Sequence, residues 1–175
     1  LEALRGAAAT AGVAFLSRTV TGRDDADVLV VATGASDELV VVAPEIATLS
    51  PIKGHIVRVA GPAVGTVVRG EGAYAAPGED MIFGATMEPG RTDAVIEEAR
   101  AAPLLAAGLR LFPDLAGRPH QVSTGVRAAT PDGLPMVGPG ATPGVMLATG
   151  ARRNGWLLAP LVAQVIAARV MERDP

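Results

Sequence analysis

Cysteine is absent from the 175-residue sequence. Its absence excludes disulfide bonds, thiolate metal sites and covalent attachment of a cofactor through sulfur. A chain without cysteine suits a reducing compartment, and we expect this one to be cytoplasmic. Histidine is scarce too: His55 and His120 are too few and too isolated to indicate a metal site.

Aromatic and charged residues are also few. Aromatic side chains make up 3% of the chain, so the core must be built from alanine, valine, leucine and isoleucine. Hydrophobic residues make up 49% and charged residues 19%, which is typical of a well-buried globular protein. The net charge of −3 gives no basic field to attract nucleic acid. No apolar run reaches the roughly 18 residues of a membrane span.

The pattern of apolar residues predicts a parallel segment followed by an antiparallel sheet. Residues 26–32 are almost continuously apolar, as in a central parallel strand that is covered on both faces. Lys53 lies near the start of the strand expected at residues 51–59, and an isolated lysine of this kind is usually solvated. We interpret four alternating or glycine-bounded runs as antiparallel strands, at residues 51–59, 66–69, 73–76 and 80–84.

Other segments are assigned from periodicity and from capping residues. The pattern predicts helices at residues 1–11, 94–100 and 103–112, and Asp93 is placed to cap the second of them. It predicts further strands at residues 13–16 and 118–127, the latter carrying Arg127.

The stretch from Gly144 to Pro160 is the most informative part of the chain. Residues 145–148 are predicted to form a buried strand, residues 149–154 a polar turn, and the apolar residues after Gly155 recur at helical spacing. A helix N-terminus placed directly after a strand offers free backbone N–H groups to an electron-rich oxygen or a phosphate. An ordinary strand–turn–helix crossover explains the same pattern, so both interpretations stay open at this point.

The residues of this stretch also resemble a known family. Ala148-Thr-Gly-x-x-Arg-Asn-Gly-x-Leu-Leu-Ala-Pro160, preceded by Thr130-Pro-Asp-Gly-Leu-Pro-Met-Val-Gly138, is similar to the C-terminal signature of the FAD-dependent D-amino acid oxidase superfamily. Within it, the glycine oxidases of thiamine biosynthesis are most similar. Four more blocks follow the family's order: Val28–Ala35, Pro51–Gly54, Tyr74–Pro77 and Gly84–Met87.

The resemblance implies an α/β plus α+β fold. Residues 1–45 and 121–175 would form part of a Rossmann-like FAD-binding domain, and residues 46–120 an inserted antiparallel-sheet domain that binds substrate. It also implies non-covalent FAD and oxidation of the C–N bond of a small, glycine-like amino acid, by hydride transfer to the flavin. Sarcosine oxidase and D-amino acid dehydrogenase activities are alternatives, as is a truncated, non-catalytic domain without flavin.

Arg127 is the strongest candidate for a catalytic and substrate-binding residue. A guanidinium group at a strand end can bind a carboxylate through two parallel hydrogen bonds, although a lone arginine is more often a surface ion-pair partner. Its position ahead of the Pro-Asp-Gly turn resembles that of the family's carboxylate-binding arginine. Tyr74 is implied as a second catalytic and substrate-binding residue, and Met87 and Arg153 as substrate-binding residues. By pattern alone, Tyr74 would be a sheet-margin residue and Met87 a core residue.

A second set of residues is implied to bind the cofactor. In the family, the end of the first parallel strand lies beside the flavin nucleotide, and the N–H groups before the last helix stabilise negative charge on the reduced flavin. The cofactor-binding residues implied for this chain are Thr33, Gly34, Gly150, Arg153, Asn154, Gly155, Trp156 and Leu157.

The Gly-x-Gly-x-x-Gly unit that holds the FAD pyrophosphate in this family is absent. We therefore expect the chain to be the C-terminal part of such an oxidase. A missing parallel strand would leave a sheet edge and an apolar face uncovered. We thus expect association, either as a homo-oligomer or with a separate N-terminal half.

Overall fold

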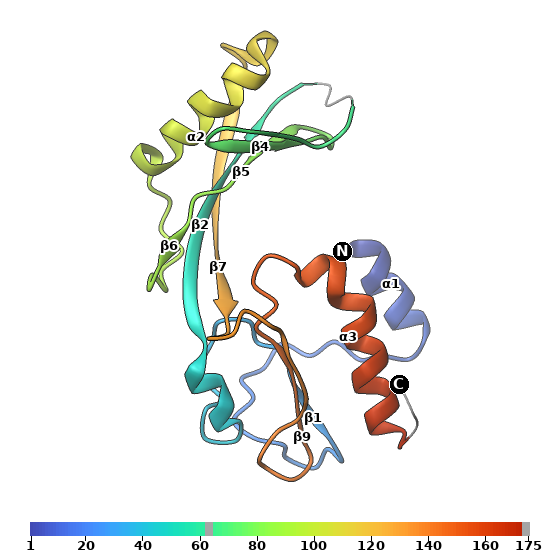
Figure 1. The fold of residues 1–175 in the computed structure, drawn as a ribbon. Helices are drawn as coiled ribbons and strands as arrows, with labels where there is room; N and C mark the ends of the chain where they lie inside the picture. The colour runs from blue at the N-terminus through green and yellow to red at the C-terminus, as the bar shows by residue number, and fades with distance from the viewer. Residues whose placement is uncertain (62–64, 173–175) are drawn as a thin grey trace.

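The computed structural model describes residues 1–61 and 65–172. Figure 1 shows two groups of elements that are joined by a pair of long strands. An antiparallel sheet with helix α2 lies at one end, and a smaller sheet with helices α1 and α3 lies at the other. This mixed α/β architecture agrees with the fold class predicted from the sequence.

The larger sheet is built on β2 (Ser50–Val59) and β7 (His120–Ala129), which pair antiparallel along their whole length. On its other side β2 pairs with β5 (Met81–Gly84) through residues 56–59 and with the short β6 (Glu88–Pro89) through residues 52–53. The hairpin of β3 (Val68–Gly70) and β4 (Ala73–Ala76) extends the sheet beyond β5. All four antiparallel strands expected from the sequence are therefore present. The sheet extends through β7 to residue 129, so the proposed domain boundary at residue 121 falls inside a strand.

Helix α2 (Glu98–Leu111) covers one face of this sheet. Its buried Ala101, Leu104 and Ala107 pack on a core that includes Val57 and Phe83. Gly108 allows the close approach, because an added Cβ there would collide with the Phe83 ring. The 3-10 turn Pro113–Leu115 follows and leads into β7.

The sequence prediction of two helices in this region was wrong. A single helix begins at Glu98 and continues through Pro103. Proline lacks one N–H donor, but burial of the apolar face of α2 outweighs this loss. Residues 94–97 are not helical, because the Glu97 N–H donates to His55 Nε2 at 3.1 Å. Asp93 accordingly does not cap α2; its carboxylate contacts Lys53.

The smaller sheet has the order β1-β9-β8. β1 (Leu29–Val31) runs parallel to β9 (Val145–Thr149), and β8 (Met136–Pro139) runs antiparallel to β9. Its core also includes residues of the segment 39–46, which leads through the 3-10 turn Pro44–Thr48 into β2. The parallel pairing confirms the prediction, but β1 is not a central strand covered on both faces. It lies at the edge of the sheet as described, and Val30 is 40% exposed.

Two helices flank the smaller sheet. α3 (Gly155–Val170) contacts β8 and β9, whereas α1 (Glu2–Thr10) contains no buried residue. The strand predicted at residues 13–16 does not form. Phe15 and Leu16 are exposed, and within the described ranges no strand pairs with this segment. Among residues 1–61 and 65–172, no helix is both long and apolar enough to cross a membrane.

Candidate active site

Arg127 lies near the end of β7, opposite Ile52 of β2. Its guanidinium group extends across Gly54, where an added Cβ would come within 2.6 Å of both terminal nitrogens. Its Nη1 donates to the Met87 sulfur at 3.6 Å. Within the described residues no carboxylate lies at ion-pair distance from Arg127, so its planar fork of donors is available to a ligand.

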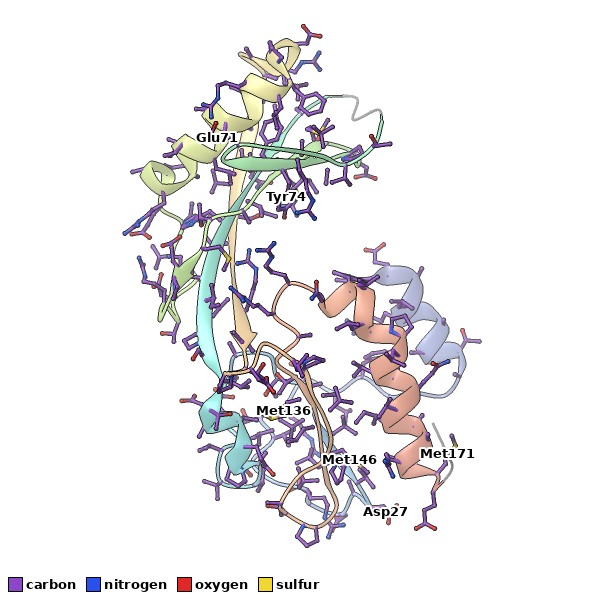
Figure 2. All side chains as sticks on the ribbon, viewed as in Figure 1. Asp27, Glu71, Tyr74, Met136, Met146 and Met171 are labelled. Atoms are coloured by element: carbon purple, nitrogen blue, oxygen red, sulfur yellow. The ribbon has the colours of Figure 1, made fainter. Side chains whose placement is uncertain are left out.

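Tyr74 lies on the same side of the sheet, opposite α2. Its neighbours Ala73 and Ala75 point into the core beneath α2, so the alternation of the strand directs Tyr74 to the other face. The phenol ring covers Gly84, its cross-strand partner on β5, and an added Cβ there would collide with it. Figure 2 shows Tyr74 projecting from the sheet towards the α3 side of the molecule.

The turn before α3 is fastened to the end of β7. The Arg152 N–H donates to the Ala128 carbonyl at 3.1 Å, and Ala151 forms a β-bridge with Ala129. Arg152 has a φ of 48°, a left-handed conformation that is uncommon for a residue other than glycine. No side chain of the described chain caps α3, because Asn154 makes no side-chain capping bond. The positive end of the helix is thus held beside the strand that carries Arg127.

These elements line an open cavity of about 850 Å³. It brings together Tyr74, Met87 and Arg127 from the sheet with four residues of the α3 turn: Arg153, Asn154, Gly155 and Trp156. Seven of the residues singled out from the sequence therefore share one cavity, although they come from positions between 74 and 156 of the chain. Their assigned roles remain predictions.

The other candidate cofactor residues lie elsewhere. Thr33 lines a second cavity, of about 650 Å³, with Ser36 and Asp37. The Gly34 carbonyl accepts a hydrogen bond from Thr149 Oγ1 at 2.9 Å, which places Gly34 close to the strand that ends before Gly150. Leu157 is 79% exposed on α3 and does not line the larger cavity.

Sequence reasoning missed two arginines of the larger cavity, Arg69 and Arg152. Arg69 pairs directly with Tyr74 across the β3–β4 hairpin. The Gly70-Glu71-Gly72 turn was a signal for that register, since a hairpin closed there places residue 69 opposite residue 74.

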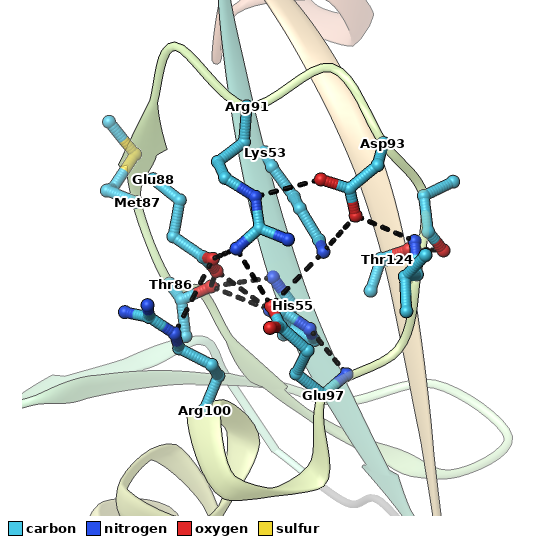
Figure 3. A network of polar contacts seen from close by, with 12 residues as sticks. Lys53, His55, Thr86, Met87, Glu88, Arg91, Asp93, Glu97, Arg100 and Thr124 are labelled. Atoms are coloured by element: carbon cyan, nitrogen blue, oxygen red, sulfur yellow. Dashed lines mark hydrogen bonds and ion pairs between the residues drawn. The ribbon is translucent and has the colours of Figure 1, made fainter.

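A buried polar network lies behind the Arg127 site, on the opposite face of β2 (Figure 3). Lys53 is fully buried, and its Nζ donates to Asp93 Oδ1 at 2.6 Å and to Glu97 Oε2 at 3.3 Å. The expectation that Lys53 is solvated was therefore wrong. Residues 91–97 fold back over β2 and supply carboxylates that neutralise its charge, and these contacts could not be seen from the local sequence.

His55 is the second fully buried member of this network. Its Nε2 accepts the Glu97 N–H, so the proton of the neutral ring lies on Nδ1, which donates to Glu88 Oε1 at 2.9 Å. The backbone N–H of His55 donates to Thr86 Oγ1 at 2.8 Å. These bonds fix both neighbours of Met87, the residue whose sulfur contacts Arg127.

The network keeps its carboxyl groups ionised. Hydrogen bonds from Arg91 and then Lys53 hold the pKa of Asp93 far below its usual value. Burial raises the pKa of Glu88, but hydrogen bonds from Thr86 and His55 outweigh it, so the pKa ends below normal. Burial likewise raises the pKa of Glu97, but its contacts with Lys53 and Arg91 outweigh this effect, so that pKa is also lowered. A set of fixed charges thus supports the wall of the cavity.

Comparison with models of known protein families assigns the chain to one of them. Residues 1–169 match the DAO family, described as FAD dependent oxidoreductase. The chain belongs to this family. The resemblance predicted from the sequence motifs is thereby confirmed.

Several curated members of the DAO family are similar in sequence. The bifunctional protein ThiO/ThiG of Trichormus variabilis is 37% identical over 90% of this chain and 25% of its own length. The tRNA 5-methylaminomethyl-2-thiouridine biosynthesis bifunctional protein MnmC of Caulobacter sp. is 37% identical over 98% of this chain and 31% of its own length. A glycine oxidase of Pseudomonas aeruginosa is 31% identical over 71% of this chain and 36% of its own length. The chain thus spans between a quarter and little more than a third of these relatives.

Solved structures agree. A glycine oxidase from Geobacillus kaustophilus has a TM-score of 0.70 and 28% identity, and an iminodiacetate oxidase from Chelativorans sp. has a TM-score of 0.74 and 25% identity. Each match covers 85% of this chain and 42% or 43% of the other. The fold is therefore part of a DAO-type oxidoreductase, with a partial Rossmann-like FAD-binding portion.

Proposed function

We propose that this chain forms the substrate-binding sheet and part of the flavin-binding portion of an FAD-dependent oxidase that acts on the C–N bond of a small, glycine-like amino acid. The observation that carries the proposal is the unpaired guanidinium group of Arg127. It faces the same cavity as Tyr74, Met87 and the uncapped N-terminus of α3.

Arg127 is suited to bind the substrate carboxylate. A guanidinium group without a protein carboxylate partner binds a ligand carboxylate through two charge-assisted hydrogen bonds. The Tyr74 hydroxyl can donate a further bond, and Met87 supplies an apolar wall beside the guanidinium group. Together these contacts would hold the amino acid with its α-carbon turned towards the α3 turn.

The residues of the α3 turn fit the ring end of FAD. The first N–H groups of α3 have no side-chain cap in the described chain, and Arg153 adds a full positive charge beside them. Such a positive wall suits the negative charge of a reduced flavin. When bound there, FAD would supply the hydride acceptor for oxidation of the amine to an imine. Thr33, Gly34 and Gly150 are proposed to flank the nucleotide.

A second candidate follows from the Caulobacter relative, whose match covers 98% of this chain. In that case the same oxidation would act on an aminomethyl group of a modified tRNA nucleoside. The net charge of −3 gives the chain as a whole no attraction to RNA, whose many phosphates bind an extended basic surface, so we favour the small amino acid.

The test uses visible spectra of the purified chain with FAD, before and after anaerobic addition of glycine, sarcosine, D-alanine or 5-methylaminomethyl-2-thiouridine. Bleaching of the flavin band by an amino acid is the expected result. A second sample replaces the corresponding part of the G. kaustophilus glycine oxidase by this chain, which restores the pyrophosphate loop. A flavin-loaded fusion that no amino acid reduces would contradict the proposal. Flavin in the fusion but not in the isolated chain would instead identify the chain alone as non-catalytic.

Substitution of Arg127 separates binding from chemistry. R127M in the flavin-loaded protein is expected to raise KM about 100-fold or more, because two hydrogen bonds to a charged group are lost. R127K keeps the positive charge but not the planar fork of donors. Its KM should therefore lie between those of the unchanged protein and R127M. Arg18, an exposed partner of Asp24 that does not line the cavity, offers the control R18M. Equal KM values for R127M and R18M would exclude Arg127 as the carboxylate-binding residue.

A further inference from the structure

Four arginines line the larger cavity: Arg69, Arg127, Arg152 and Arg153. No aspartate or glutamate is among the described residues that line it. Glycine carries a single carboxylate, for which Arg127 suffices, and Arg153 lies at the end of the cavity proposed for the flavin ring. Arg69 and Arg152 therefore exceed what a glycine-type substrate needs.

Arg69 is directed into the cavity by the register of its hairpin. It is paired with Tyr74 in the β3–β4 ladder, and directly paired residues of an antiparallel sheet project from the same face. That face is the one turned away from α2, where Tyr74 and Arg127 lie. Arg69 takes part in no hydrogen bond or ion pair among the described side chains.

Arg152 approaches from the other wall. Its backbone N–H donates to the carbonyl of Ala128, the residue after Arg127. This bond holds the backbone of Arg152 beside the end of the strand that carries Arg127. Its backbone is in the left-handed region, and residues other than glycine in that region cluster at functional sites. Like Arg69, it has no carboxylate partner within the described ranges.

Several unpaired cations around one cavity repel one another and create a positive potential that favours anions. A zwitterionic amino acid brings no net charge, whereas one with a second carboxylate brings one net negative charge. We propose that the cavity selects an amino acid that carries a second anionic group, with Arg127 on the carboxylate next to the reacting carbon and Arg69 and Arg152 on the second group. This inference rests on the function proposed above, and it names the substrate class.

The test compares two secondary amines that differ in one group. Sarcosine carries a methyl group on nitrogen, and N-carboxymethylglycine carries a carboxymethyl group there. Isothermal titration calorimetry of each into the 175-residue chain is expected to show at least tenfold tighter binding of the dicarboxylate. The preference should shrink as salt rises from 20 to 300 mM, because salt screens exposed charges.

Variants assign the effect to residues. R69M and R152M are each expected to reduce the ratio of the two affinities at least threefold, whereas R18M, at a residue that does not line the cavity, leaves the ratio as in the unchanged chain. D-aspartate against D-alanine repeats the comparison with the second carboxylate on carbon. Equal affinities within both pairs, or ratios that neither R69M nor R152M alters, would overturn the inference.

The binding test needs neither flavin nor turnover, so its failure is distinguishable from failure of the proposed function. Flavin reduction by glycine together with equal affinities supports the oxidase and overturns the dicarboxylate substrate. A dicarboxylate preference that depends on Arg69 supports a ligand with a second anionic group even in a protein whose flavin no amine reduces. Binding of none of the four compounds overturns the inference, whereas flavin reduction in the fusion still decides the proposed function.

Discussion

At the scale of single residues, the site depends on glycines that leave room for larger side chains. Gly54 lies under the Arg127 guanidinium group and Gly84 under the Tyr74 ring. Neither glycine has a positive φ, so the requirement at both positions is space and not backbone conformation. A residue with no side chain of its own thus determines where a functional side chain lies.

Gly54→Ala tests this dependence. The new Cβ would meet both Arg127 nitrogens and the Thr86 carbonyl oxygen, so we expect a loss of about 1–3 kcal/mol in the free energy of unfolding. We also expect weaker binding of carboxylate ligands. Gly125, the cross-strand partner of Gly54, has open space around it, and Gly125→Ala is the matched control. Urea unfolding and ligand titration of both variants give the comparison. Equal behaviour of the two variants would show that Gly54 does not position Arg127.

At the scale of secondary-structure elements, the segment 91–97 replaces a predicted helical turn by a cover over β2. Its carboxylates neutralise Lys53, and its backbone caps the His55 ring. Helix α2 begins at Glu98, directly after the residues that make these contacts. Tertiary ion pairing therefore decides where α2 starts.

This segment predicts a dependence of stability on pH. The pKa values of Glu88, Asp93 and Glu97 are lowered in the folded state, so these groups stabilise the fold above their unfolded values near 4. That stability is lost as the pH falls through the lower folded values. The free energy of unfolding should decline from pH 5 to pH 2.5, and it should decline less in K53M, which lacks one cation of the network. Urea titrations at several pH values measure both slopes; identical slopes would argue against the network as their source.

The packing of α2 on the sheet gives a further prediction. Gly108→Ala places a Cβ against the Phe83 ring, and we expect it to destabilise the protein by about 1–3 kcal/mol. Gly6 lies in the exposed helix α1, where an added Cβ meets nothing within 4 Å. Gly6→Ala should be neutral or stabilise by up to about 1 kcal/mol, because alanine favours helix. A Gly108→Ala variant as stable as Gly6→Ala would contradict the close packing described here.

At the scale of the whole molecule, the smaller sheet and its helices leave much apolar surface exposed. Trp156, Leu157 and Leu161 on α3 are each more than half exposed, as is Leu16 in the segment after α1. The chain spans only part of the length of its relatives. An uncovered apolar face of this kind favours association.

We predict that the isolated chain self-associates at micromolar concentration. Sedimentation velocity should show a rise in the weight-average sedimentation coefficient with concentration, and L157E or L161E should reduce that rise. Ala106 is exposed on α2, away from this face, so A106E is the control that adds the same charge elsewhere. A monomer at all concentrations, or an equal effect of A106E, would contradict association through α3.

The sequence alone determined the family, the antiparallel strands and the identity of Arg127, Tyr74, Met87 and Arg153 as candidates. These follow from local order: alternation along a strand, and motifs whose residues are adjacent in the chain. Strand 145–149 and the helix after Gly155 were likewise visible, because each carries its own apolar pattern.

Only the tertiary structure decided how these pieces meet. The burial of Lys53, the late start of α2, the edge position of β1 and the arrival of Arg69 and Arg152 at the cavity all depend on contacts between segments that are distant in sequence. Ion pairing and burial act through space, so a charge that looks solvated in the sequence can become the centre of a network once another segment folds over it.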